Sequence, residues 1–81
     1  MSALDTALIA AHAAGDGPAL VRLYTQAADA AEPTDIDAAC FFLTHAYVFA
    51  LEQDHPEVAT IRARLVAHGR EPGAQSSFSP S

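Results

Sequence analysis

One stretch of the chain cannot be left on the surface of a small domain. The twelve residues "CFFLTHAYVFAL", from Cys40 to Leu51, include only two polar side chains, Thr44 and His45. A helix that crosses a membrane needs about 20 apolar residues, so this run is too short to span one. Since the whole chain has 81 residues, it forms one domain at most. Other parts of that domain, or a partner, must therefore cover the apolar run.

Capping residues and prolines predict two helices in the first half of the chain. Ser2 is suited to cap the first helix, and Gly15 is suited to close it. Asp16 is suited to cap the second, with Pro18 in its first turn, where a missing N–H costs nothing. The pair Glu32-Pro33 then ends the second helix.

Two more helices are expected in the second half. Thr34 offers a capping hydroxyl with the acid Asp37 three residues later, the pattern of a capping box, and the third helix should run from there to about Gln53. The fourth is expected to open at Asp54 and to stop at Gly69. No alternation of apolar and polar residues rivals this pattern, and the many alanines favour helix. The sequence thus predicts an all-α fold.

The chain also repeats itself. The segments "DGPALVRL" (16–23) and "DHPEVATI" (54–61) share the pattern Asp-x-Pro-x-aliphatic-x-x-aliphatic, 38 residues apart. Each segment is expected to open the second helix of a pair, and repeats of this length with two helices per unit form stacked hairpins. We therefore expect two stacked antiparallel helical hairpins within residues 1–69. Residues 70–81, "REPGAQSSFSPS", have the composition of a flexible tail.

Four residues hold characteristic places in these two units. Leu43 and Tyr47 lie on the expected first helix of the second unit, and Tyr24 and Pro33 lie on and after the second helix of the first unit. With these residues the chain resembles tetratricopeptide-repeat proteins, although the Trp and Gly of that pattern are absent. The resemblance implies a concave groove that is lined by the first helix of each unit and that binds another protein.

The apolar run, placed on a helix, has two apolar sides. The side expected to face the core carries Ile36, Ala39, Cys40, Leu43, Tyr47 and Leu51. The other side carries Phe41, His45, Val48 and Phe49. One interpretation is that this third helix is central and is buried on several sides. The other is that its second side is a docking surface.

The resemblance would place that second side in the groove, together with one side of the first helix. The expected partner-binding residues are Asp5, Ile9, His12, Phe41, His45, Val48 and Phe49. Such a surface suits a helix or an extended peptide. A stable repeat array usually needs about three units, so a second copy of this chain is another expected partner.

The charge pattern excludes several other partners. The net charge is −6, lysine is absent, and the four arginines are scattered, so neither nucleic acid nor an anionic membrane surface is expected as a partner. Cys40 is the only cysteine, and its place on the core side predicts an inert thiol. The start of the chain lacks the pattern of a signal peptide. These features predict a cytoplasmic protein.

Residues suited to catalysis or metal binding are sparse. No histidine lies four residues from another on a helix, and none pairs with a cysteine at a zinc spacing. We therefore expect no metal, no cofactor and no enzymatic activity. The alternatives are a minimal metal-binding protein or enzyme centred on His12 and His45, and a subunit that stabilises a larger enzyme.

Overall fold

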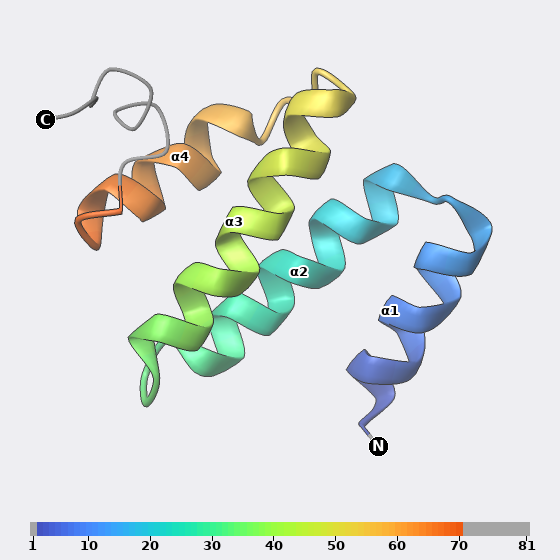
Figure 1. Ribbon diagram of the computed structural model, residues 1–81, viewed down its shortest axis with the longest axis horizontal. Coiled ribbons are helices and arrows are strands. Elements are labelled where there is room, and N and C mark those ends of the chain that lie inside the picture. Colours follow the sequence, from blue (N-terminus) through green and yellow to red (C-terminus); the bar gives the residue numbers. More distant parts are fainter. Residues whose placement is uncertain (1, 71–81) are drawn as a thin grey trace, which may run out of the picture.

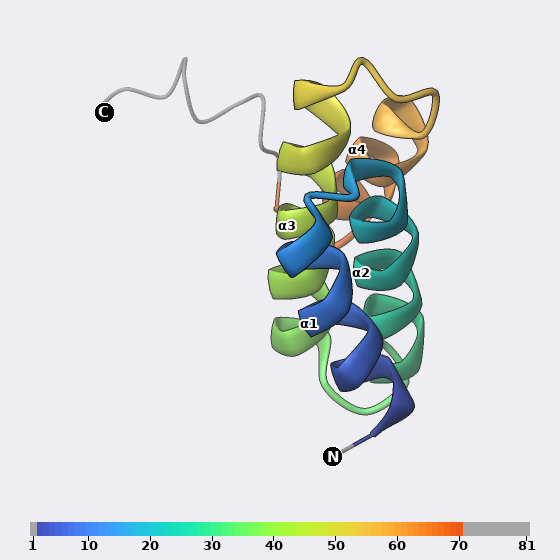
Figure 2. The same cartoon turned by 90° about the vertical axis from the view of Figure 1, so that its right-hand side faces the viewer.

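The computed structural model describes residues 2–70, and this part of the chain forms four α-helices and no strand (Figure 1). The helices are α1 (Ala3–Ala14), α2 (Gly17–Ala31), α3 (Ile36–Glu52) and α4 (Val58–Ala67). Successive helices run in opposite directions, so α1 and α2 form one hairpin and α3 and α4 form the other (Figure 2). The hairpins stack through α2 and α3, which confirms the predicted all-α class of stacked antiparallel hairpins. Apart from Arg70, the predicted tail lies outside the described residues.

The predicted boundaries of the first hairpin are confirmed. The Ser2 hydroxyl accepts a hydrogen bond from the Asp5 N–H at 3.1 Å, and the Asp5 carboxylate accepts one from the Ser2 N–H at 3.5 Å, so α1 begins with a capping box. Gly15 ends α1 at φ 65°, a left-handed conformation that glycine adopts without a steric cost. The Asp16 carboxylate then accepts from the Ala19 N–H at 3.2 Å and caps α2.

The expected cap of the third helix was wrong by one residue. Asp35, not Thr34, is the N-cap of α3, and its carboxylate accepts a hydrogen bond from the Ala38 N–H at 3.0 Å. Thr34 lies in the preceding turn, where its N–H donates to the carbonyl of Ala31. A carboxylate is as good a cap as a hydroxyl, so the sequence "TDID" holds two competing caps.

The expected start of the fourth helix was also wrong. Asp54 has φ 52° and ends α3 rather than opening α4. The N–H groups of Asp54 and His55 donate to the carbonyls of Leu51 and Ala50, which closes the last turn of α3. Helix α4 therefore begins only at Val58, and no side chain caps it.

Small residues let α2 and α3 pack closely. Ala28 on α2 and Ala39, Ala46 and Ala50 on α3 are all 0% exposed. These alanines lie around a core that also contains Val21, Cys40, Leu43, Ile61 and Leu65. A second cluster, between α1 and α2, contains Ala11, Ala19, Leu20 and Leu23. The apolar run of the sequence is thus covered mainly by α2 and α4.

The buried side of α3 differs from the predicted stripe at both ends. Leu51 is 52% exposed and Ile36 is 40% exposed, whereas both were expected in the core. The reason is that α3 turns its alanines towards α2, so the buried side is centred on Ala46 and Ala50. Leu43 is fully buried as predicted, and Tyr47 is half-buried.

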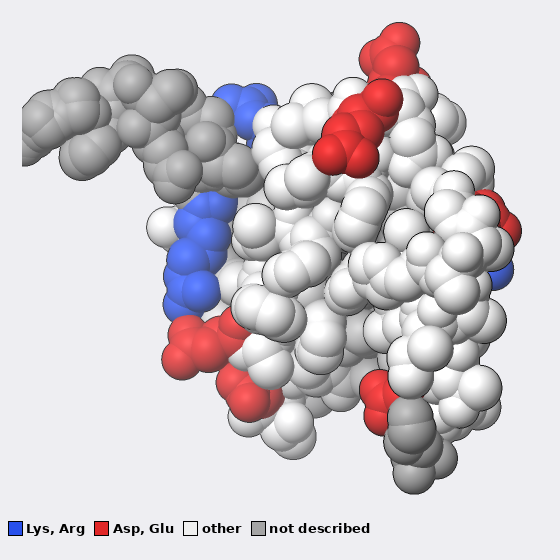
Figure 3. Space-filling view, turned by 45° about the vertical axis from the view of Figure 1, so that its right-hand side comes forward, with Lys and Arg blue, Asp and Glu red and all other residues white. Residues whose placement is uncertain are grey.

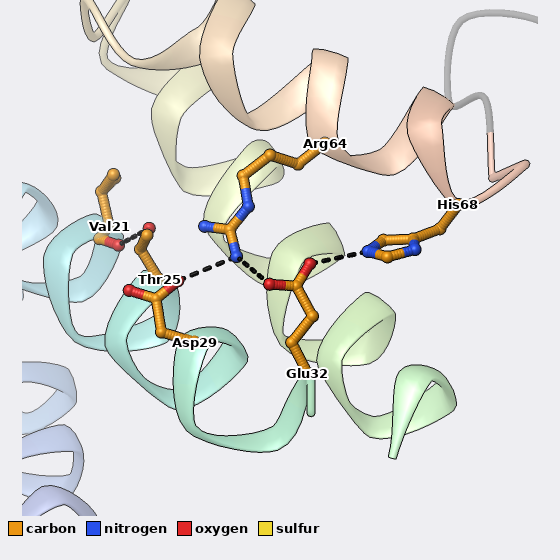
Figure 4. Close-up of polar contacts among 6 residues, drawn as sticks. All are labelled: Val21, Thr25, Asp29, Glu32, Arg64 and His68. Atoms are coloured by element: carbon orange, nitrogen blue, oxygen red, sulfur yellow. Dashed lines mark hydrogen bonds and ion pairs between the residues drawn. The ribbon is translucent and has the colours of Figure 1, made fainter. Parts of the chain in front are cut away.

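An ionic clasp, formed by Asp29, Glu32, Arg64 and His68, holds α4 against the end of α2 (Figure 4). Arg64 Nη2 lies 2.8 Å from Asp29 and 3.2 Å from Glu32, and His68 Nε2 lies 2.7 Å from Glu32. The hydrogen bond with His68 lowers the pKa of Glu32; partial desolvation opposes this effect and the charge of Arg64 adds to it. The clasp lies beside α4, whereas the ion pair that α3 itself forms within residues 2–70 joins Asp37 to Arg70 at 2.7 Å.

Candidate partner-binding face

A row of contacting rings runs across α3, α2 and α1. The ring centroids of Phe41 and His45 lie 4.5 Å apart, and those of His45 and Tyr24 lie 5.1 Å apart. Tyr24 also stacks on Phe49 at 5.9 Å, and Phe49 meets the edge of His12 at 5.7 Å. Tyr24 of α2 therefore joins four of the expected partner-binding residues into one row. Aromatic pairs at these distances attract one another beyond their shared buried area.

Hydrogen bonds fix the two histidines in this row. His12 Nε2 lies 2.9 Å from the Tyr24 hydroxyl, which links α1 to α2. His45 Nδ1 donates to the carbonyl of Phe41 at 2.9 Å, one turn earlier on α3. Both rings are thereby held in one orientation, and the row forms a rigid support for the side chains around it.

Three apolar members of the expected set are exposed. Ile9 on α1 is 59% exposed, Val48 on α3 is 46% exposed, and Phe41 at the end of the row is 58% exposed. Phe49 is half-buried and packs against both core clusters. Asp5 is exposed at the start of α1, where its carboxylate belongs to the capping box.

We call this surface the α1–α3 face. It consists of Asp5, Ile9 and His12 on α1 and of Phe41, His45, Val48 and Phe49 on α3. The two helices run in the same direction, so their N-terminal ends lie at one end of the face and their C-terminal ends at the other (Figures 1 and 2).

The sequence analysis did not place Tyr24 at this site and named it only as a characteristic residue of the repeat pattern. The structure places it half-buried at the centre of the ring row, in contact with both histidines. A signal was present in the sequence, because Tyr24 is the one aromatic residue among the leucines and alanines of that helix. A tyrosine in such a position needs a hydrogen-bond partner for its hydroxyl, and that requirement pointed to a neighbouring polar side chain.

Three shallow hollows follow the face from one end to the other. The first, of about 270 Å³, lies at the N-terminal end and is lined by Leu4, Asp5, Leu8, Ala27, Ala30, Ala31 and Phe42. The second, of about 210 Å³, lies on α3 and is lined by Thr44, His45, Val48 and Phe49. The third, of about 580 Å³, lies at the C-terminal end, with His12, Phe49, Glu52 and Gln53 among its lining residues. Side chains of a partner could enter each of them.

The surface around these hollows is almost free of charge. Figure 3 shows a broad uncharged area with the charged side chains around its margin. Within residues 2–70 the ion pairs all involve Arg64, His68 or Arg70, which belong to α4 and the residues after it. One of these ion pairs, Arg70 with Asp37, borders the face, because both residues line a hollow of about 390 Å³ together with Phe41 and His45.

Groups suited to catalysis or metal binding are not gathered on this face. In the described part of the chain, no three or more His, Cys, Asp or Glu side chains lie close enough together to hold a metal ion. His12 and His45 both lie against Tyr24, and within residues 2–70 neither forms an ion pair with a carboxylate. Cys40 is 3% exposed, as its place on the core side predicted.

Comparison with known proteins gives this chain no relatives: no family model, no curated protein and no solved structure matches it. Among residues 2–70, no helix has the length and apolar character needed to cross a bilayer.

Proposed function

We propose that this chain is a small protein–protein interaction module with tetratricopeptide-like architecture. It binds a partner helix or peptide, or a second copy of itself, through the α1–α3 face, and it has no catalytic role. The observation that carries the proposal is the exposure of Ile9, Phe41 and Val48 on α1 and α3, two helices that contain no Lys or Arg. Single exposed apolar side chains are common, whereas contiguous ones mark interaction sites. The buried thiol of Cys40 is compatible with the cytoplasmic setting that the sequence predicts.

The rigid support under the face also favours binding. Aromatic residues that are already held in one orientation lose little conformational entropy when a partner binds. The entropic cost of binding therefore offsets less of the favourable contact energy. Phe41 is anchored in this way through His45 and Tyr24. A phenylalanine buries about 150–250 Å² when it is covered completely, and such residues often dominate the binding energy of an interface.

Affinity capture from the native cell tests the proposal. The baits are the wild type, a Phe41→Ser/Val48→Ser double variant and a Val66→Ser control. Val66 is 39% exposed on α4, so the control removes a side chain of the same type and similar exposure from another surface. Phe49 is left intact because it packs against both core clusters.

We expect a protein that the wild type and Val66→Ser both retain and that the double variant loses. Circular dichroism of the three proteins should show equal helix content. A partner that the double variant retains equally well would contradict the proposal.

A further inference from the structure

The charges around the α1–α3 face point to the chemistry of its partner. We propose that this partner is a basic amphipathic helix, whose apolar stripe lies on the face while its Lys or Arg side chains reach the carboxylates at the two ends. This inference rests on the proposed function, because it names the partner class for the same face.

Both helices of the face lack basic side chains apart from histidine. Helices α1 and α3 contain no Lys or Arg, and their acidic residues are Asp5, Asp37 and Glu52. Asp37 is paired with Arg70 at 2.7 Å. Among residues 2–70, neither Asp5 nor Glu52 forms an ion pair. The face thus has at each end one carboxylate that forms no ion pair within residues 2–70, although the Asp5 carboxylate also accepts the Ser2 N–H in the capping box.

Glu52 lies at an end of α3 that favours a cation. It is the last residue of α3, and the last turn of that helix contains no basic residue. The C-terminal end of a helix carries a partial negative charge, so the helix end and the carboxylate attract a cation together. Glu52 lines the largest of the three hollows with Phe49 and His12.

Glu52 also lies on the exposed side of α3. Phe41, His45, Val48 and Glu52 follow one another at intervals of four, three and four residues, so they lie on one side of the helix. A partner helix lying along this side meets apolar residues first and a carboxylate at the end. From Phe41 to Glu52 that side is about 17 Å long, within a helix of 17 residues.

A second copy of this chain fits these charges less well than a basic helix. Each copy carries a net charge of −6 and would bring its own Asp5 and Glu52 to the shared face. Screening acts over about 8 Å at physiological salt, so like charges in direct contact still repel each other. A helix with positive charges beside its apolar stripe instead compensates both carboxylates.

Two synthetic peptides test this inference. Each has about 18 residues, so its length as a helix matches that of α3. Both have leucines at helical spacing along one side; the remaining positions are lysine in one peptide and glutamate in the other. Fluorescence anisotropy with the full chain measures their binding at low and moderate salt. We expect the lysine peptide to bind at least about tenfold more tightly, and we expect added salt to weaken its binding.

Protein variants locate the contact. Phe41→Ser should abolish binding of the lysine peptide, and Glu52→Gln should weaken it by about two- to fivefold, as for other exposed ion pairs. Asp29→Asn is the control, because it also removes one carboxylate but lies in the clasp beside α4. Circular dichroism should show that all three variants keep the helix content of the wild type.

Equal or tighter binding of the glutamate peptide would overturn the inference, and so would an equal effect of Glu52→Gln and Asp29→Asn. If the lysine peptide fails to bind while the Phe41→Ser/Val48→Ser variant still loses its cellular partner, the basic helix is wrong and the proposed function stands. A dimer that uses this face and tightens as salt rises would identify the second copy as the partner instead.

Discussion

The two sides of α3 should respond differently to truncation. Leu43 is 0% exposed and packs in the cluster with Ile61 and Leu65, so Leu43→Ala leaves a cavity that its neighbours fill only in part. Such substitutions cost about 2–5 kcal/mol. A domain of this size has a free energy of unfolding of roughly 3–10 kcal/mol, so the variant should be severely destabilised or unfolded.

Val48→Ala should cost far less. Val48 is 46% exposed, and the substitution removes two methyl groups. At about 0.8 kcal/mol for each fully buried carbon, the loss stays below about 1 kcal/mol. The better helix propensity of alanine offsets part of that loss.

Thermal unfolding followed by circular dichroism at 222 nm, a standard helix signal, measures both changes. In a domain of this size 1 kcal/mol shifts the Tm by about 4–8 °C, so Leu43→Ala should lower it by about 10 °C or more and Val48→Ala by a few degrees. An equal loss of stability in the two variants would show that α3 is buried on all sides. The α1–α3 face would then lose its basis.

Three further predictions concern the turn, the clasp and the tail. Gly15→Ala should destabilise the protein by about 1–2 kcal/mol in a denaturant titration, because Gly15 has φ 65° and an alanine there is strained. Glu32→Gln should lower the Tm at neutral pH. At a pH well below 4.5, the ordinary pKa of that carboxyl group, the variant and the wild type should have the same Tm. The sign follows from the lowered pKa of Glu32 in the folded state: its contribution to stability is complete above pH 4.5 and is lost as the pH falls through the lowered value. Deleting residues 72–81 should leave the Tm almost unchanged, because both core clusters lie within residues 2–70; a fall of many degrees would contradict this.

Local chemistry made much of the fold predictable. Ser2, Gly15 and Asp16 act within a few residues of their own positions, and the structure uses each as the sequence predicted. The predicted helix start at Asp54 was wrong because an aspartate between two helices has two possible roles. It can end the first helix in the left-handed conformation, or it can cap the second. The hydrogen bonds at the end of α3 decide between these roles, and the sequence does not reveal them.

The candidate face was harder to predict, because it depends on how the helices turn against one another. The helical period placed Phe41 and Val48 on one side of α3, and both are exposed. It also placed Leu51 in the core, yet the alanines of α3 pack against α2 and leave Leu51 at the surface. The role of Tyr24 arises only from the contact of three helices, and a pattern along one helix does not report such a contact.

Site-specific photocrosslinking in the native cell is the sharpest test of partner binding at the α1–α3 face. A benzophenone amino acid replaces Phe41 in one version of the protein and Val66 in another, so the two probes differ in the surface that they sample. We expect a discrete crosslinked product for the probe at position 41 and none for the probe at position 66. A product formed at position 66 alone, or equally at both positions, would contradict the assignment of the α1–α3 face as the binding surface.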